Sequence, residues 1–97
     1  MIDAFENWIA ANGDNFKEKG LQYEVTKSPL DIDKPSVRID FDSDKYVSRI
    51  VVWSTGECNM EALDVESEQS VIDKYCVIES AEEFDNCFAE FFEKIEA

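Results

Sequence analysis

The stretch VRIDFDSDKYVSRIVVW, residues 37–53, determines the fold of this chain. Apolar and charged residues alternate from 37 to 41, which predicts a strand with one buried face and one wet face. Residues 42–45 are typical of a turn, and residues 46–53 are rich in the aromatic and β-branched side chains that favour strands. We therefore expect two neighbouring antiparallel strands joined by a tight turn.

Three further strands extend this pair. Residues 21–26 alternate in the same way and predict a strand before it. Residues 58–65 change parity near Ala62, which predicts a bulge or a twist at that point. Residues 71–78 carry apolar side chains on both parities, so the sequence leaves open which of them face the core. Short polar turns separate these runs, as in a meander.

A helix is expected at the beginning of the chain. Apolar residues recur at helical spacing from residue 2 to residue 16, with Trp8 beside them, and Gly20 supplies a stop. Gly13 lies inside this segment, where glycine disfavours a helix. The sequence leaves open whether Gly13 breaks the helix or only weakens it.

The last segment carries the strongest helical signal. Ser80 and Glu83 have the spacing of a capping box, which marks a helix N-terminus. The amphipathic stripe that follows predicts packing against the core. Its members are Phe84, Cys87, Phe88, Phe91, Phe92 and Ile95.

The order of these elements predicts an α+β fold. We expect an antiparallel β-meander of about five strands, with the N- and C-terminal helices packed on one face. The chain has 97 residues, enough for one domain and too few for two, so residues 1–97 are expected to form a single domain.

The charge of the chain restricts its partners. It has 23 Asp and Glu residues against 9 Lys and Arg, no His, and a formal net charge of −14 at pH 7. Residues 49–97 hold 13 of the acids and 3 of the bases, so we expect the acidic face in the second half. Binding to nucleic acid or to an anionic membrane requires clustered Lys and Arg, so neither is expected. An acidic surface favours a basic protein partner.

The sequence offers little catalytic equipment. The absence of His removes the commonest general base and the commonest zinc ligand. The three cysteines show no C-x-x-C spacing, so they are interpreted as reduced thiols packed in the core. Asp40, Asp42 and Asp44 resemble the start of a calcium loop, but Lys45 and Val51 stand where that loop requires Gly and Glu. We expect an acidic turn there, and no metal, cofactor or enzymatic activity.

The N-terminal residues predict a cytoplasmic protein. The sequence MIDAFENW carries acids where a secretion signal carries positive charge. No apolar run is long enough to span a bilayer.

Arg49 indicates a candidate binding face. An arginine is costly to bury unpaired, and alternate residues of a strand share a face, so an outward Arg49 carries Trp53 outward with it. Both residue types are enriched in interface hot spots. The alternative is that Trp53 caps the edge of the core and Arg49 points elsewhere. The candidate partner-binding residues on this face and the next turn are Asp40, Arg49, Trp53, Asn59, Glu61, Asp64 and Glu66.

Several short motifs resemble a known family. They are FENW at 5–8, KPS at 34–36, IDFDS at 39–43, KYV at 45–47, VW at 52–53 and GEC at 56–58. They look like the TriTu-type immunity proteins of bacterial polymorphic-toxin systems, including contact-dependent growth inhibition. The resemblance spans most of the chain and implies a small cytosolic protein that binds one cognate toxin domain, often a nuclease, and blocks it. It assigns no contact residues.

Residues and resemblance together predict a cytoplasmic immunity protein. It would neutralise a basic nuclease domain through acidic surface complementarity, occluding the active site or substrate groove. A small acidic secretion chaperone or adaptor, binding a client segment and commonly a homodimer, is the alternative. An enzyme that uses carboxylates or cysteine alone is a third possibility. The oligomeric state is left open.

Overall fold

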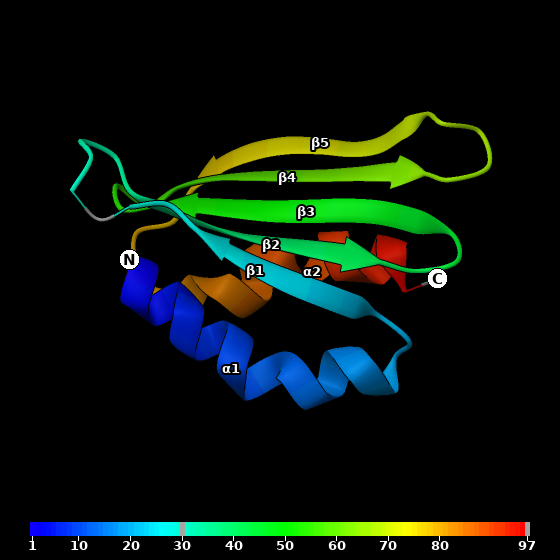
Figure 1. Cartoon of the computed structure of the whole chain (residues 1–97), viewed down its shortest axis with the longest axis horizontal. Coiled ribbons are helices and arrows are strands. Elements are labelled where there is room, and N and C mark those ends of the chain that lie inside the picture. Colours follow the sequence, from blue (N-terminus) through cyan, green and yellow to red (C-terminus); the bar gives the residue numbers. More distant parts are fainter. Residues whose placement is uncertain (30, 97) are drawn as a thin grey trace.

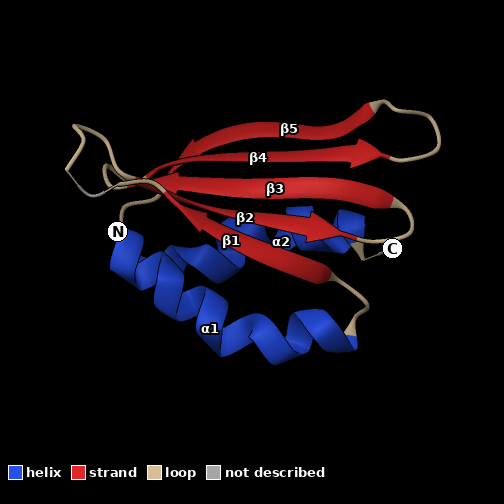
Figure 2. Cartoon of the chain, viewed as in Figure 1, coloured by secondary structure: helices blue, strands red, loops and turns tan. Residues whose placement is uncertain are grey.

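Five strands form one antiparallel sheet in which each strand pairs with its neighbour in sequence (Figure 1, Figure 2). The computed structural model describes residues 1–29 and 31–96. Its elements are α1 (Ile2–Glu18), β1 (Gln22–Lys27), β2 (Ser36–Asp42), β3 (Tyr46–Trp53), β4 (Glu57–Asp64), β5 (Ser70–Val77), the 3-10 turn η1 (Ala81–Glu83) and α2 (Phe84–Ile95). The predicted meander between two terminal helices is confirmed.

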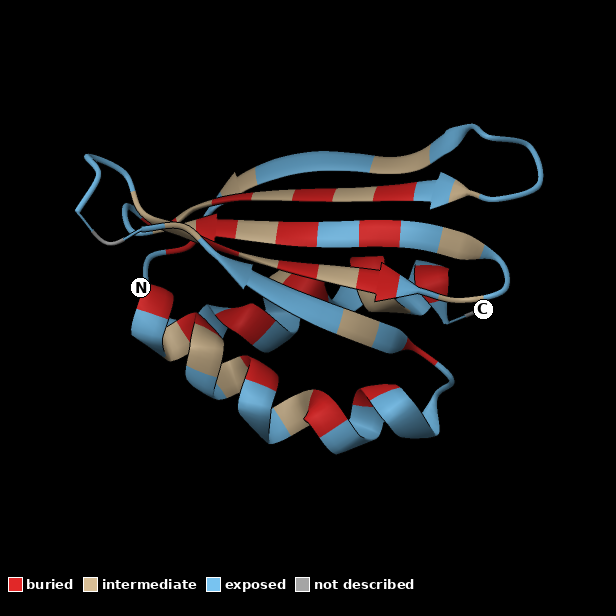
Figure 3. Ribbon diagram, viewed as in Figure 1, coloured by how far each residue is buried: buried red, intermediate tan, exposed pale blue. Residues whose placement is uncertain are grey.

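Both helices lie on the same side of the sheet (Figure 1). Alternate residues of β2, β3 and β4 are buried beneath them, and the residues between are partly or fully exposed (Figure 3). The register places Ile39, Ile50 and Met60 side by side across these strands, and each is at most 1% exposed. The side of the sheet away from the helices, which none of the described elements covers, is called the open face below.

An aromatic cluster joins the helices to each other and to the sheet. The Trp8 ring of α1 lies 5.2 Å from the Phe88 ring of α2, measured between centroids. The Phe41 ring of β2 lies 5.1 Å from Phe16 and 6.1 Å from Phe91. Tilted and edge-on contacts of this kind suit the charge distribution of aromatic rings. The prediction that the C-terminal phenylalanine stripe belongs to the core is therefore confirmed.

Helix α1 runs unbroken through Gly13, which settles the question left open by the sequence. Gly13 is buried, and a Cβ atom at this position would lie 2.5 Å from the Tyr23 hydroxyl oxygen. Gly13 therefore lowers the helix propensity of α1 but leaves room for the Tyr23 ring of β1 to approach the helix.

The C-terminal helical segment begins as its sequence predicts, with the capping box at the 3-10 turn η1 that precedes α2. The capping box is present, and Glu83 Oε2 accepts hydrogen bonds from the backbone N–H groups of Ser80, at 2.7 Å, and Glu79, at 2.8 Å. These bonds satisfy donors at the approach to a helix start, before the phenylalanine stripe begins at Phe84.

An irregularity is present next to Ala62, as predicted, but β4 keeps its alternation and the extra residue, Val71, lies on β5. The pairing with β5 shifts between Ala62 and Leu63. Beyond the shift, Cys76 pairs with the buried Cys58 and therefore faces the helices. The residues on either side of Cys76 point to the open face, because side chains alternate along a strand. The register thus decides the facing of β5, which the sequence could not.

The turn between β3 and β4 requires glycine. Gly56 has φ +90°, and a Cβ atom there would collide with the carbonyl oxygen of Ile78. The Ile78 N–H in turn donates to the Gly56 carbonyl oxygen at 2.7 Å. This close approach ties the end of β5 to the turn.

Neither of the two described helices has the length and apolar character needed to cross a bilayer.

Candidate partner-binding face

A row of charged side chains crosses the open face from one edge of the sheet to the other. Each member pairs in register with the next across β1 to β5. The members, called the acidic row below, are Glu24, Asp40, Arg49, Glu61 and Asp73. Strands lie about 4.8 Å apart, so the row places four carboxylates and one guanidinium at that spacing.

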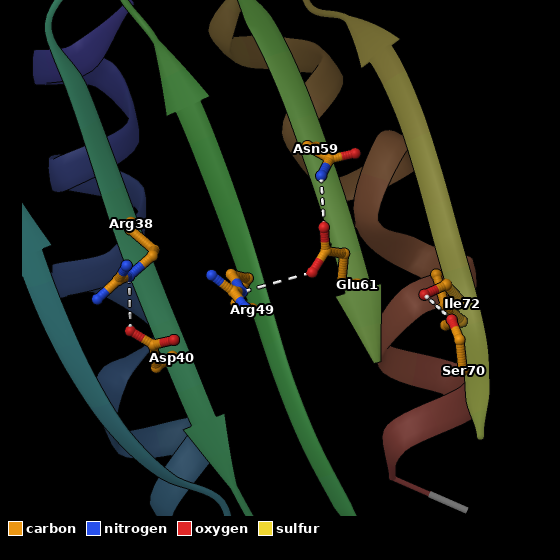
Figure 4. Close-up of polar contacts among 7 residues, drawn as sticks. All are labelled: Arg38, Asp40, Arg49, Asn59, Glu61, Ser70 and Ile72. Atoms are coloured by element: carbon orange, nitrogen blue, oxygen red, sulfur yellow. Dashed lines mark hydrogen bonds and ion pairs between the residues drawn. The ribbon is translucent and has the colours of Figure 1, made fainter. Parts of the chain in front are cut away.

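The charges of the acidic row are only partly compensated by neighbours (Figure 4). Arg49 Nε lies 3.6 Å from Glu61 Oε2, and both side chains are nearly half exposed. Arg38 Nε donates to Asp40 Oδ2 at 2.9 Å, with similar exposure. Exposed ion pairs of this kind contribute about 0–1 kcal/mol. A partner can therefore exchange them for its own contacts at little cost, and the row keeps an excess of negative charge.

A shallow depression of about 400 Å³ lies over the middle of this row. Val47 and Leu63 form an apolar side of it, and they are 51% and 41% exposed. Arg49, Glu61 and Asp73 supply polar walls. The open face thus combines exposed apolar surface with carboxylates, a combination that fits the apolar centre and charged rim of protein interfaces.

Trp53 lies at one end of the open face rather than at its middle, since it is the last residue of β3. It is half-buried, and Lys34 Nζ lies 5.4 Å above its ring centroid. Lys34 also forms an ion pair with Glu57 at the start of β4. The ring is therefore outward, as Arg49 predicted, but it is partly covered by a cation of its own chain.

Asn59 and Glu61 lie next to one another on β4, and their side chains interact. Asn59 Nδ2 donates to Glu61 Oε1 at 3.0 Å, which leaves Glu61 held between an amide and the guanidinium of Arg49 (Figure 4). Asp40, Arg49, Asn59 and Glu61 therefore form one contiguous group on the open face. These four are the predicted site residues that the structure brings together.

Asp64 and Glu66 lie outside that group. Asp64 continues the alternation of β4 beyond the buried Ala62 and pairs with Tyr46, so it points to the helix side. Its Oδ1 accepts from the backbone N–H groups of Glu66, at 2.9 Å, and Ser67, at 3.0 Å. Asp64 therefore closes the turn between β4 and β5, and exposed Glu66 extends from that turn.

The turn also holds the Asp64 carboxyl in its charged form. The hydrogen bond from the Ser67 backbone is the largest cause of a pKa below the ordinary 3.8, and the positive charge of Lys94 adds a smaller contribution. Partial burial acts in the opposite direction. The structural role of Asp64 thus has a clear physical basis.

Sequence reasoning missed Glu24 and Asp73, the two ends of the acidic row. Glu24 lies on the outward parity of β1, so alternation could have included it. Asp73 depends on the extra residue that β5 carries opposite Ala62 and Leu63, and the parity change noted near Ala62 did not assign that residue to β5. The row draws two acids from each half of the chain, so this surface is not confined to the second half, where the sequence has its acidic surplus.

The structure also locates the three cysteines. All are free thiols; Cys58 is buried, and Cys76 and Cys87 are half-buried. Among residues 1–29 and 31–96, no group of three or more His, Cys, Asp or Glu side chains is arranged to hold a metal ion.

Comparison with known proteins identifies the family. No curated protein matches the chain significantly. The family model described as immunity protein TriTu matches residues 3–94. That match includes all five strands and nearly the full length of both helices. The chain therefore belongs to the TriTu immunity protein family, and this membership implies that it neutralises a toxin.

Proposed function

We propose that this protein binds a basic nuclease toxin domain through its open face and blocks the toxin's active site or substrate groove. The partner-binding residues are Asp40, Arg49, Asn59 and Glu61 at the centre, and Trp53 at one end. Asp64 and Glu66 contribute through the turn between β4 and β5. The toxin would be neutralised in the cytoplasm, without catalysis by the immunity protein.

The observation that carries this proposal is the acidic row itself. A nuclease must hold phosphate groups, and Lys and Arg commonly form such surfaces. Two carboxylates on each side of Arg49, on strands about 4.8 Å apart, present negative charge along a line, as a nucleic-acid backbone does. They can therefore occupy the same cations and compete with the substrate.

The energetics of the open face favour exchange with a charged partner. The ion pairs of Arg38 and Arg49 are exposed and weak, so breaking them costs little. Opposite charge across an interface speeds association, up to about 10⁸–10⁹ M⁻¹s⁻¹ at low salt. The depression beside Val47 and Leu63 gives the same face apolar area to bury, which slows dissociation.

A charge-matched pair of variants tests the location of the site. Asp40→Lys with Glu61→Lys reverses two charges of the acidic row. Glu82→Lys with Glu93→Lys reverses two exposed charges of the C-terminal helical segment and changes the net charge equally. Each variant is co-expressed with the C-terminal domain of whatever protein the gene directly upstream encodes, and growth, co-purification and association rate are measured.

The row variant is expected to lose protection and to associate at least about tenfold more slowly at low salt, whereas the helix variant changes the rate by less than about threefold. Circular dichroism checks that both variants fold. Equal losses in the two variants would refute the open face as the binding site. If the unaltered protein neither rescues growth nor forms a complex, the immunity proposal for that neighbour is wrong. Capture of an extended client segment by a homodimer would then favour the adaptor.

A further inference from the structure

Two thiols from different layers of the fold touch each other. Cys76 lies on the helix side of β5, the edge strand, and Cys87 lies on the sheet side of α2. Their Sγ atoms are 2.9 Å apart, and both side chains are half-buried. No described disulfide joins them, and the three thiols do not form a metal site among the described residues. This pair is therefore available for covalent chemistry that neither the fold nor the proposed function uses.

The geometry favours this pair over the other possible pair. A disulfide requires its sulfur atoms about 2.05 Å apart, so closure needs a movement of less than about 1 Å here. Cys58 also pairs with Cys76 across the sheet, and cross-strand Cα separations fall within the range that disulfides accept. Cys58, however, is 0% exposed, whereas Cys87 is reachable from solvent. An oxidant in solution meets Cys76 or Cys87 first.

We propose that Cys76 and Cys87 are a reversible oxidation site, at which a small-molecule disulfide such as oxidised glutathione converts the two thiols into one intrachain disulfide between β5 and α2. In the first step, one thiolate attacks a glutathione sulfur, the glutathione disulfide bond breaks, and one glutathione leaves and takes up a proton. In the second step, the other thiol loses its proton and attacks the mixed disulfide, which releases the second glutathione. The protein loses two hydrogen atoms, and the oxidant gains them as two thiols.

The surroundings set the rate of this exchange. Burial, followed by the hydrogen bond with Cys76, raises the pKa of Cys87 to about 12, and the positive charge of Lys74 partly opposes the rise. Because the thiolate is the attacking species, attack by Cys87 is slow near neutral pH and accelerates as pH rises.

The crosslink acts on the side of the sheet opposite to the acidic row. Tyr75 and Val77 flank Cys76 on the open face, and both are exposed. Closure therefore fixes the edge strand to α2 and leaves the open face accessible. The proposal does not depend on the proposed function.

The test uses the purified full chain in glutathione buffers of increasing oxidised fraction at pH 8. Remaining thiols are blocked with an alkylating agent, and intact mass and peptide mapping identify the products. Cys76→Ser and Cys87→Ser remove one member of the pair each. Cys58→Ala is the matched control, because it removes a neighbouring thiol and keeps the pair.

The unaltered chain and Cys58→Ala are expected to lose two hydrogen atoms in mass and to yield a peptide joining Cys76 to Cys87. The crosslinked protein is expected to melt about 10 °C higher than the reduced protein, because the unfolded chain is constrained. Cys76→Ser and Cys87→Ser are expected to stop at a mixed disulfide with glutathione. A peptide joining Cys58 to Cys76 in the unaltered chain would overturn the proposal. Glutathione adducts without an intrachain bond, or no reaction, would overturn it equally.

Discussion

Trp8 and Trp53 are the two tryptophans of the chain, and their substitution by alanine should have opposite consequences. Trp8 lies between α1 and α2, where its ring meets five phenylalanines at centroid distances of 5.2–6.1 Å. Its indole N–H donates to Asp85 Oδ1 at 2.9 Å. Trp53 instead lies at the end of the open face, under Lys34.

The expected loss for Trp8→Ala follows from these contacts. Removing a large aromatic side chain from a core costs about 3–5 kcal/mol of unfolding free energy. Trp8 is half-buried, so we expect a loss of unfolding free energy at the lower end of this range, about 3 kcal/mol. The total free energy of unfolding of such a chain is about 5–15 kcal/mol. In a chain of this size a loss of about 3 kcal/mol should lower Tm by about 15 °C. Trp53→Ala should cost less than about 1 kcal/mol, because its ring contributes little to the core.

Urea titration followed by far-ultraviolet circular dichroism measures the free energy of unfolding of both variants. Circular dichroism is used because each substitution removes a tryptophan that fluorescence would use as its probe. Trp8→Phe serves as an intermediate, because it keeps an aromatic ring and removes the hydrogen bond, at an expected cost of about 1–2 kcal/mol. Under the proposed function, Trp53→Ala should weaken toxin binding by about 2 kcal/mol, the magnitude of an interface anchor. A loss below about 1 kcal/mol for Trp8→Ala, or an equal stability loss for Trp53→Ala, would refute this division of roles.

Three further substitutions test the packing and the turn. Gly13→Ala should lower the free energy of unfolding by about 1 kcal/mol, because the new methyl group meets the Tyr23 hydroxyl. In a chain that already carries Tyr23→Phe, Gly13→Ala should instead raise it by up to about 1 kcal/mol. Additive effects of the two substitutions in urea titrations would contradict the contact. Ser48 Oγ is buried without a hydrogen-bond partner among the described residues, so Ser48→Ala should raise stability by about 1 kcal/mol, and a lower Tm would count against that assignment. The lowered pKa of Asp64 contributes stability that is present above pH 3.8 and is lost as pH falls toward the folded value. Asp64→Asn keeps an acceptor for the Ser67 N–H group but removes the charge, so the free energy of unfolding should fall less as the pH is lowered through this range. The same fall in both proteins would refute the role of the charge.

Much of the fold could be predicted because its signals are local. Alternation in residues 37–41 gave the buried and wet sides of β2, and β3 begins and ends as expected, although the sequence left its facing open. The capping box at Ser80 and the stripe after it located the C-terminal helix. Periodicity reflects which side chains one element must bury, so a single segment contains the information.

The site was predicted only in part, because its completeness depends on register. Alternation predicted that an outward Arg49 would share a face with Asp40 and Glu61, but Asp73 joins them only through the shift between β4 and β5. Asp64, by contrast, points to the helix side by simple alternation from Ala62, and there it closes a turn. A change of one residue in pairing reverses the facing of every later side chain, and no local pattern encodes that change.

The sequence by itself determined the elements and the acidic surplus, since composition and periodicity are properties of the chain alone, but it left the facing of Arg49 open. Only the tertiary structure decided that five strands align their charges in one row, that Gly13 accommodates Tyr23, and that Cys76 meets Cys87. These features join residues that are distant in sequence, and their positions follow from how the helices and strands pack rather than from any single segment.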